Sequence, residues 1–399
     1  MGASKRGEPG ADAELGPPRD DRRIVRTPGR VNLLGEHIDY HDLDVLPMAL
    51  DRGIEVRFTP RRDGVVRLEN ADPRFEAVEV PVRTELRSDA PGHWGNYVRA
   101  AVTAVAALAP ERGRAREVGF GGFDGVVSAD LPTAAGLSSS SALVVAVARA
   151  LLQTHLDPAW TPPAPAQLAE LLAAGERYVG TAGGGMDQAA TLGGEPGRVM
   201  RVSFAPVRWI DRPLPAEWAV IVAHTGVRAE KSGSAREAYN ALRARGEFAR
   251  DTLAALLGTA QKYAALRTAA PTTDLLAQAE RHLDPASAAV AEHVLTEADR
   301  VDAGWAALEA GDRRAFGTAM SGSHRSLTRR CGVGHSRLDA LVQTALHAGA
   351  DGARLTGAGF GGSIVALVAV DRADAVLQAL RDGNRDAGLL PANAPVFRA

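Results

Sequence analysis

The sequence LPTAAGLSSSSAL, residues 131 to 143, places a glycine and four consecutive serines directly before an apolar run with helical spacing, VVAVARALLQTHL. The first backbone N–H groups of a helix have no partner within the helix, and the helix dipole favours an anion at that end. Serine hydroxyls add hydrogen-bond donors or a metal ligand. The stretch therefore predicts a phosphate-binding loop, although a simple N-cap with a flexible turn has the same composition.

The predicted loop is not a P-loop, because the string GxxxxGK[ST] does not occur in the chain. A triphosphate bound here would be held by backbone N–H groups, hydroxyls and a metal ion. The string GAGFGG at 357 to 362 matches the GxGxxG pattern of dinucleotide-binding proteins, but the strand-like SIVALVAV follows it where that pattern requires a helix. A dinucleotide-binding oxidoreductase is therefore disfavoured.

Two further segments combine glycines with charged residues. The first, PGRVNLLGEHIDYHDLDVLPMAL, covers residues 28 to 50. Its candidate functional side chains are Arg30, Glu36, His37 and Asp39. The second, GGGMDQ at 183 to 188, places three glycines before Asp187, and glycines allow a backbone to approach a ligand closely. Taken alone, each segment is also compatible with a turn that carries a solvated acid.

The three segments resemble, in order and spacing, the GHMP small-molecule kinases and specifically their galactokinase branch. That branch carries GRxNLxGEHxDYxxxxVLPxA, PxxxGLSSSxAL, GxMDQ and TGAGxGG. The matching stretches here are residues 29–49, 132–143, 184–188 and 356–362. WGNYV at 94–98 and SGSHRSL at 321–327 also resemble the branch, so the resemblance covers most of the chain.

The resemblance implies an α+β fold with mixed sheets, helices and an active site between two domains. A length of 399 residues also exceeds one ordinary core. Residues 1–22 mix Gly, Pro and charges, which predicts a disordered tail. Prolines gather at 203–217 before the apolar run AVIVAH, and we therefore expect an N-terminal domain over 23–205 and a C-terminal domain over 206–399.

The implied activity is ATP-dependent phosphorylation of the anomeric hydroxyl of D-galactose. Asp187 is then the residue that accepts the proton of the C1 hydroxyl or orients that hydroxyl. Arg30 is the cation that keeps the carboxylate ionised and stabilises charge on the phosphoryl group. A buried Arg–Asp pair made only for stability is the alternative.

The remaining site residues fall into three groups. The sugar-binding group is Glu36, His37, Asp39, Gly185 and Tyr239, the last in EAYNALR at 237–243. The ATP-binding group is Trp94, Gly136, Leu137, Ser138, Ser139 and Ser140. The Mg²⁺ candidates are Ser140 or Ser139, and Glu176, for which a solvated helix face is the alternative reading. TGAGFGG is expected to support the loop and the sugar by close backbone approach.

Three positions depart from the pattern of the branch. Ala134 replaces the first glycine of the usual PxGxGLSSS, and Asp42 and Asp44 replace small residues near the sugar. GEHIDY and GTAGGGMDQ resemble the N-acetylgalactosamine kinase subgroup, whereas Tyr239 favours galactose because a phenol leaves less room for an acetamido group. One alternative is therefore an N-acetylgalactosamine kinase. Another is a catalytically silent sugar sensor, since some galactokinase-like proteins are regulators. Mevalonate and homoserine are disfavoured because GEHIDY belongs to the sugar branch.

Composition limits the partners. The formal net charge of −2 provides no broad basic surface for nucleic acid. The single cysteine, Cys331, excludes an intrachain disulfide. Neither a signal peptide nor an 18-residue apolar run is present. We expect a cytoplasmic monomer whose partners are a sugar and ATP, without nucleic acid or membrane.

Overall fold

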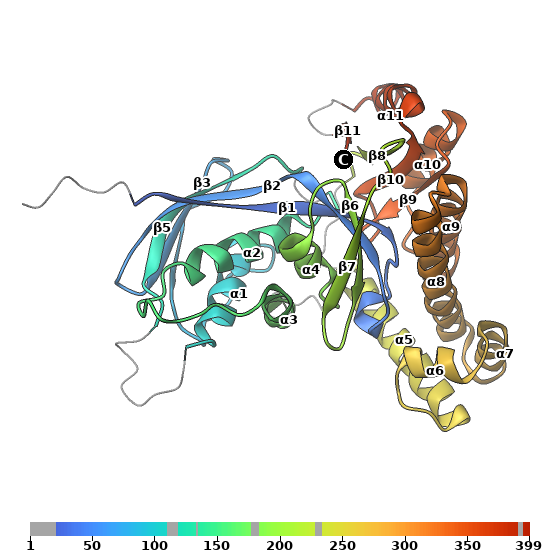
Figure 1. Ribbon diagram of the computed structural model, residues 1–399, viewed down its shortest axis with the longest axis horizontal. Coiled ribbons are helices and arrows are strands. Elements are labelled where there is room, and N and C mark those ends of the chain that lie inside the picture. The colour runs from blue at the N-terminus through green and yellow to red at the C-terminus, as the bar shows by residue number, and fades with distance from the viewer. Residues whose placement is uncertain (1–20, 110–118, 133–134, 177–182, 228–233, 390–393) are drawn as a thin grey trace, which may run out of the picture.

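The computed structural model describes residues 21–109, 119–132, 135–176, 183–227, 234–389 and 394–399. Within these residues, the strands form one mixed sheet and one antiparallel sheet, and helices pack against both (Figure 1). The α+β class predicted from the sequence is confirmed. The predicted tail lies outside the described residues, apart from Asp21 and Arg22.

The first sheet has the order β4-β3-β5-β2-β6-β7, and β1 pairs with β2. Only β3 and β5 run parallel. Its strands are β1 (Arg23–Leu34), β2 (Leu46–Pro60), β3 (Val65–Asn70), β4 (Val78–Pro81), β5 (Gly122–Ala129), β6 (Arg198–Ser203) and β7 (Arg208–Pro213). The β1–β2 register shifts between Pro28 and Arg30, and again between Asn32 and Leu34. Arg30 therefore lies on an irregular stretch of strand, where such shifts can redirect a side chain.

The second sheet has the order β11-β8-β10-β9. Its strands are β8 (Trp218–His224), β9 (Gly352–Thr356), β10 (Ser363–Ala369) and β11 (Val396–Arg398). All seven residues of β8 are buried, as expected of a strand covered on both faces. Since β7 pairs with β6, the expected division at 205/206 runs between two paired strands. The chain passes from the first sheet to the second between Pro213 and Trp218, and the domain bounds stay a prediction.

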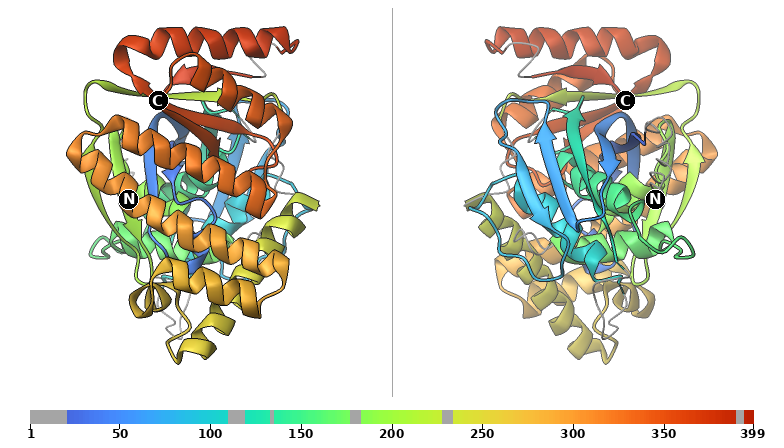
Figure 2. Two further views of the ribbon diagram at one scale, coloured as in Figure 1. Left: turned by 90° about the vertical axis from the view of Figure 1, so that its right-hand side faces the viewer. Right: turned by 90° about the vertical axis from the view of Figure 1, so that its left-hand side faces the viewer.

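The helices form two groups. The first group is α1 (Gly95–Ala106), α2 (Ser139–Leu152), α3 (Pro165–Glu176) and α4 (Met186–Gly193). The second is α5 (Ser234–Leu257), α6 (Tyr263–Ala269), α7 (Thr272–His282), α8 (Pro285–Ala310), α9 (Arg313–Ser326), α10 (Ser336–His347) and α11 (Ala373–Asp386). The first group covers one face of the first sheet (Figure 1). Helices α8 and α9 lie side by side on the outer surface of the second domain (Figure 2).

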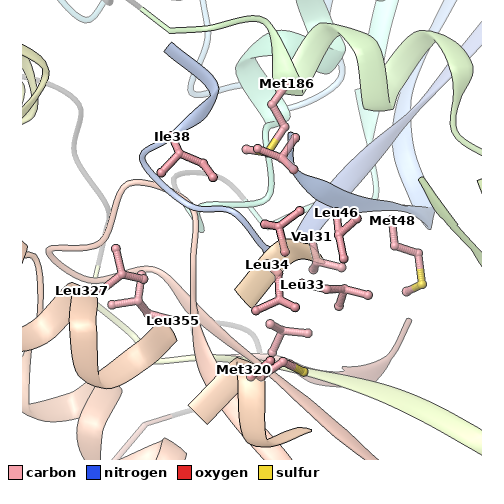
Figure 3. Close-up of a cluster of buried hydrophobic side chains, with 14 of the residues drawn as sticks. Val31, Leu33, Leu34, Ile38, Leu46, Met48, Met186, Met320, Leu327 and Leu355 are labelled. Atoms are coloured by element: carbon pink, nitrogen blue, oxygen red, sulfur yellow. The ribbon is translucent and has the colours of Figure 1, made fainter. Parts of the chain in front are cut away.

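A continuous hydrophobic core joins the two domains. Leu33 and Leu34, near the end of β1, are fully buried, and Met320 of α9 and Leu355 of β9 belong to the same cluster. Figure 3 shows these side chains converging with Met186 of α4. Because β1 carries Arg30 and the segment after it carries Glu36, this shared core fixes the candidate site between the domains.

Candidate active site

The buried guanidinium of Arg30 and the half-buried carboxylate of Asp187 form an ion pair. Arg30 Nε and Nη2 each lie 2.7 Å from Asp187 Oδ1. Burial acts to lower the pKa of Arg30, but the charges of Asp187 and then Glu36 outweigh burial and raise it. The two residues that sequence reasoning assigned to catalysis are therefore in direct contact.

The position of Asp187 follows from a helix rather than from an open turn. Gly185, with φ of 106°, precedes α4, and Asp187 lies in the first turn of that helix. A helix N-terminus stabilises a carboxylate. Ser141 adds a second contact, because its hydroxyl donates to Asp187 Oδ2 at 3.4 Å. Ser141 is the fourth serine of the run, and the sequence-based assignment stopped at the third.

Arg30 also joins the ion pair to the serine-rich loop. Its Nη1 donates to the carbonyl of Gly136 at 2.7 Å, and its backbone N–H donates to the carbonyl of Leu137. Gly136 has φ of 74°, and a Cβ there would lie 2.8 Å from the carbonyl oxygen of Thr356. A Cβ on Gly357 would in turn lie 2.7 Å from the carbonyl oxygen of Gly136. The close backbone approach expected between the loop and TGAGFGG is therefore present.

The serines of this loop lie at the start of α2. Ser138 precedes the helix in a left-handed conformation, with φ of 58°. Its buried Oγ has no hydrogen-bond partner among the described residues. Ser139 and Ser140 form the first turn and are half-buried. The loop thus brings the unengaged hydroxyl of Ser138, two half-buried serines and the helix N–H groups to one place, a donor set suited to phosphate oxygens.

The segment between β1 and β2 contributes His37 and Asp39. His37 Nδ1 lies 3.0 Å from the hydroxyl of Tyr40, and Nε2 lies 3.1 Å from the carbonyl of Ala358. Burial lowers the pKa of His37 to about 3, so the ring is neutral at physiological pH. Asp39 Oδ2 accepts the N–H of Gly184 at 3.0 Å. Burial and then the charge of Asp187 raise the pKa of Asp39.

Glu36 is anchored more firmly than the sequence suggested. Its Oε2 accepts from Arg354 Nη2 at 2.9 Å and from the N–H of Gly357 at 3.0 Å. Arg354 lies in β9, and its side chain is fully buried. No sequence motif pointed to Arg354. Its only sequence signal is an arginine three residues before the glycine string GAGFGG.

Tyr239 of α5 approaches the same segment from the second domain. Its ring lies 5.3 Å from the ring of His37 and 5.6 Å from that of Tyr40, between centroids. Burial, followed by the charges of Asp39 and Asp187, raises the pKa of Tyr239 well above its usual value. The phenol is therefore protonated at neutral pH and can donate a hydrogen bond.

Other predicted residues lie apart from this cluster. Trp94 is 7% exposed and packs edge-on against Phe75, and its indole N–H donates to the carbonyl of Glu76. An adenine contact through the remaining edge of Trp94 stays a prediction. Glu176 ends α3, and its side chain lies outside the described part of the structure, as does Ala134.

The two aspartates that depart from the family pattern have separate surroundings. Asp42 is exposed. Asp44 pairs with Arg201 of β6 at 2.6 Å, and Arg201 also pairs with Asp302 of α8 at 2.6 Å. Asp44 therefore takes part in an ion-pair network that links the two domains.

Comparisons with known proteins define the class. The GHMP kinase N-terminal domain model matches residues 96–195, and the GHMP kinase C-terminal model matches residues 306–386. The fold is similar to that of the mevalonate kinase of Methanococcus jannaschii, with a TM-score of 0.60 at 17% identity, covering 96% of this chain and 98% of that one. Fold and sequence together define a GHMP-type small-molecule kinase.

More specific matches identify the branch. The galactokinase galactose-binding signature matches residues 14–60. A galactokinase of Chloroflexus aurantiacus is 37% identical over 372 residues, covering 90% of this chain and 87% of that protein. One of Streptomyces coelicolor is 37% identical over 375 residues, covering 92% and 89%. The crystal structure of Lactococcus lactis galactokinase complexed with galactose has a TM-score of 0.79 at 25% identity, covering 95% and 93%. The chain belongs to the galactokinase family of GHMP kinases.

In the part of the chain that the structure describes, no helix is both long and apolar enough to cross a bilayer. The same residues contain no group of three or more His, Cys, Asp or Glu side chains suited to a metal ion.

Proposed function

We infer that the chain transfers the γ-phosphoryl group of ATP to the C1 oxygen of D-galactose, giving galactose 1-phosphate and ADP. The observation that carries this inference is the Arg30–Asp187 pair, which lies between the sugar-binding segment and the serine-rich loop. In phosphoryl transfer, most of the catalysis comes from aligning the acceptor and neutralising charge.

In the proposed step, the C1 oxygen forms a bond to the γ-phosphorus, and the bond from that phosphorus to the β,γ-bridging oxygen breaks. The proton of the C1 hydroxyl passes to Asp187, while the electron pair of the broken bond leaves with ADP. Arg30, in contact with Asp187 Oδ1, keeps the carboxylate ionised and stabilises negative charge near the attacking oxygen.

Sugar recognition is assigned to Glu36, His37, Asp39, Gly185 and Tyr239. Four of them lie in or beside the buried cluster around His37 and Asp187, and Gly185 supplies backbone at the start of α4. Neighbouring sugar hydroxyls differ only in direction, so rigid acceptors and donors penalise the wrong epimer through unpaired buried groups.

The nucleotide phosphates are assigned to Gly136, Leu137 and the serines at the start of α2. Ser138 is the strongest candidate, because its buried hydroxyl has no protein partner within the described residues. Mg²⁺ would be held by Ser139 or Ser140 together with the phosphates, and would neutralise phosphate charge when bound. A ligand role for Glu176 stays a prediction, as do the monomeric state and the cytoplasmic location.

The comparisons favour galactose over the alternatives, and one experiment separates all of them. It measures kcat/KM for galactose, N-acetylgalactosamine and glucose with ATP and Mg²⁺, followed by ADP release. We expect galactose to exceed the other two by at least about 100-fold, because Tyr239 crowds an added acetamido group and inversion at C4 leaves a buried acceptor unpaired. Equal or faster turnover of N-acetylgalactosamine would favour an N-acetylgalactosamine kinase. No turnover with any of the three sugars would favour a catalytically silent sugar sensor.

A further inference from the structure

Helix α8 contacts the backbone of the sugar-binding segment, and α9 packs against α8. His293 of α8 is fully buried, and its Nε2 lies 2.9 Å from the carbonyl oxygen of Glu36. Its Nδ1 lies 2.9 Å from Ser326 Oγ of α9. A carbonyl can only accept, so Nε2 carries the proton and Nδ1 accepts from the serine hydroxyl.

One turn further along α8, Glu297 makes a second backbone contact. Its Oε1 accepts the N–H of Gly35 at 2.9 Å and the hydroxyl of Ser323 at 2.6 Å. Its Oε2 accepts from Arg300 Nε at 2.6 Å. Burial acts to raise the pKa of Glu297, but the charge of Arg300, with that of Arg354 and the hydrogen bond from Ser323, outweighs burial and lowers the pKa to about 2. The carboxylate therefore stays ionised and keeps accepting at neutral pH.

These contacts explain the SGSHRSL motif, whose function the sequence left open. Its Ser323 and Ser326 are three residues apart and therefore lie on one face of α9, toward α8. Each serine binds one of the two α8 side chains that hold the segment. The motif thus fixes the orientation of both side chains without touching the sugar-binding residues itself.

The segment needs such support because its backbone is strained. Gly35 has φ of 95° and His37 has φ of 61°. A left-handed conformation costs a non-glycine residue about 1–2 kcal/mol, so it persists only where the surroundings fix it. The contacts at Gly35 and Glu36 lie directly before His37, and the side-chain position of His37 follows from them.

We propose that His293 and Glu297, oriented by Ser326 and Ser323, are positioning residues for sugar binding. They hold the backbone at residues 35–36 so that His37 and Asp39 meet the sugar at fixed angles. The proposal rests on the sugar-binding role given to this segment under Proposed function.

The test compares Ser326→Ala with Ser326→Thr, which keeps the hydroxyl, and with Thr318→Ala. Thr318 is exposed on the same helix, and its hydroxyl binds only the helix carbonyl of Arg314 among the described contacts. Steady-state kinetics give the KM for galactose, the KM for ATP and kcat, and thermal unfolding gives Tm. We expect Ser326→Ala to raise the galactose KM about five- to tenfold with the ATP KM unchanged. Ser326→Thr should restore most of the loss, and Thr318→Ala should have no effect.

Two outcomes would overturn the proposal. One is a galactose KM within about 1.5-fold of wild type while Tm falls, which would make the contact purely structural. The other is an equal rise in both KM values. His293→Gln, which keeps a donor near the position of Nε2, should be milder than His293→Leu. Wild-type turnover of galactose is measured in the same series, so a failure of the proposed function is recognised separately.

Discussion

The proposed sugar side of the site, around Glu36, His37 and Asp39, and the proposed phosphate side, around Ser138, differ in whether their side chains already have protein partners. On the sugar side, the side chains of Glu36, His37 and Asp39 all bind protein groups. On the phosphate side, Ser138 has a buried hydroxyl without a partner in the described residues, and the next two serines are half-buried. Epimer discrimination requires angles fixed before binding, whereas phosphate oxygens can be met by donors that gain partners only on binding.

The Arg30–Asp187 pair connects these two sides, so breaking it should have the largest effect. Asp187→Asn keeps the shape but can neither carry the charge nor take the proton. We expect kcat to fall by at least about 1000-fold while ATP still binds. ATP binding is measured by calorimetry. Asp42→Asn, at an exposed carboxylate, is the control and should keep wild-type turnover.

If the pair serves only stability, Asp187→Asn will lower Tm and leave turnover within about threefold of wild type. Arg30→Lys sharpens the same question. A lysine keeps the charge but cannot contact both Asp187 and the carbonyl of Gly136 with a planar fork, so its rescue relative to Arg30→Ala should be partial.

The rigidity of the proposed sugar side can be tested at His41. This buried residue lies two positions after Asp39 and contacts Gly246 of α5. A Cβ on Gly246 would overlap the imidazole of His41. Helix propensity alone would make Gly246→Ala stabilising by about 1 kcal/mol, whereas overpacking should make it destabilising by about 2 kcal/mol. The sign is read from urea unfolding.

The matched control is Gly383→Ala in α11, where an added Cβ would meet Thr344 at an ordinary 3.7 Å. That variant should be neutral or stabilising. His41→Asn combined with Gly246→Ala should recover most of the stability that Gly246→Ala loses, because a shorter side chain at position 41 leaves room for the new Cβ. Additive losses in the double variant would show that the two residues do not interact.

Acid should weaken the sugar side through the same histidine. Burial, and then Arg250 and Arg243, lower the pKa of His41 to about 3. Between that value and the unfolded value near 6.5, the unfolded chain binds the extra proton, so stability falls as pH falls. From pH 7 to pH 5, this histidine should cost about 2 kcal/mol.

Urea unfolding at pH 7, 6 and 5 measures the effect. Between pH 7 and pH 5, the free energy of unfolding should fall by about 2 kcal/mol less in His41→Asn than in the wild type, because the two proteins differ only in this ring. Parallel curves for the two proteins would mean that His41 is not held neutral.

A substitution on the proposed phosphate side should change ATP binding rather than the stability of the fold. Ser138→Ala removes a hydroxyl that has no described protein partner, so the free energy of unfolding should change by no more than about 1 kcal/mol. The KM for ATP should rise about fivefold, with the galactose KM unchanged. A marked loss of stability without a change in the KM for ATP would contradict the claim that the Ser138 hydroxyl serves ATP binding rather than the fold.

Local patterns in the sequence were sufficient to predict the α+β class and the loop before α2, whereas the pairing of Arg30 with Asp187 was predicted from the resemblance to the galactokinase branch. The sequence did not predict Arg354, His293 or Glu297. Each of these is a single charged or polar residue on a regular element, and only the tertiary fold brings it to Gly35 and Glu36.

Two other features depended on context that the sequence does not display. The first is the start of β2 at Leu46, because pairing with β1 extends the strand through an apolar stretch that contains a proline. The second feature is the packing of Trp94 against Phe75 in the core, and the contact of Trp94 with adenine stays a prediction. The sequence alone does not distinguish an aromatic residue of a binding site from one of a core.

The most direct test of the account is the identity of the product. Galactose is incubated with ATP, Mg²⁺ and the wild-type enzyme, and the sugar phosphate is examined by proton-coupled ³¹P NMR. The account predicts a phosphorus signal split by the single anomeric proton, as in galactose 1-phosphate. A signal split by the two methylene protons at C6 would contradict transfer to the C1 oxygen.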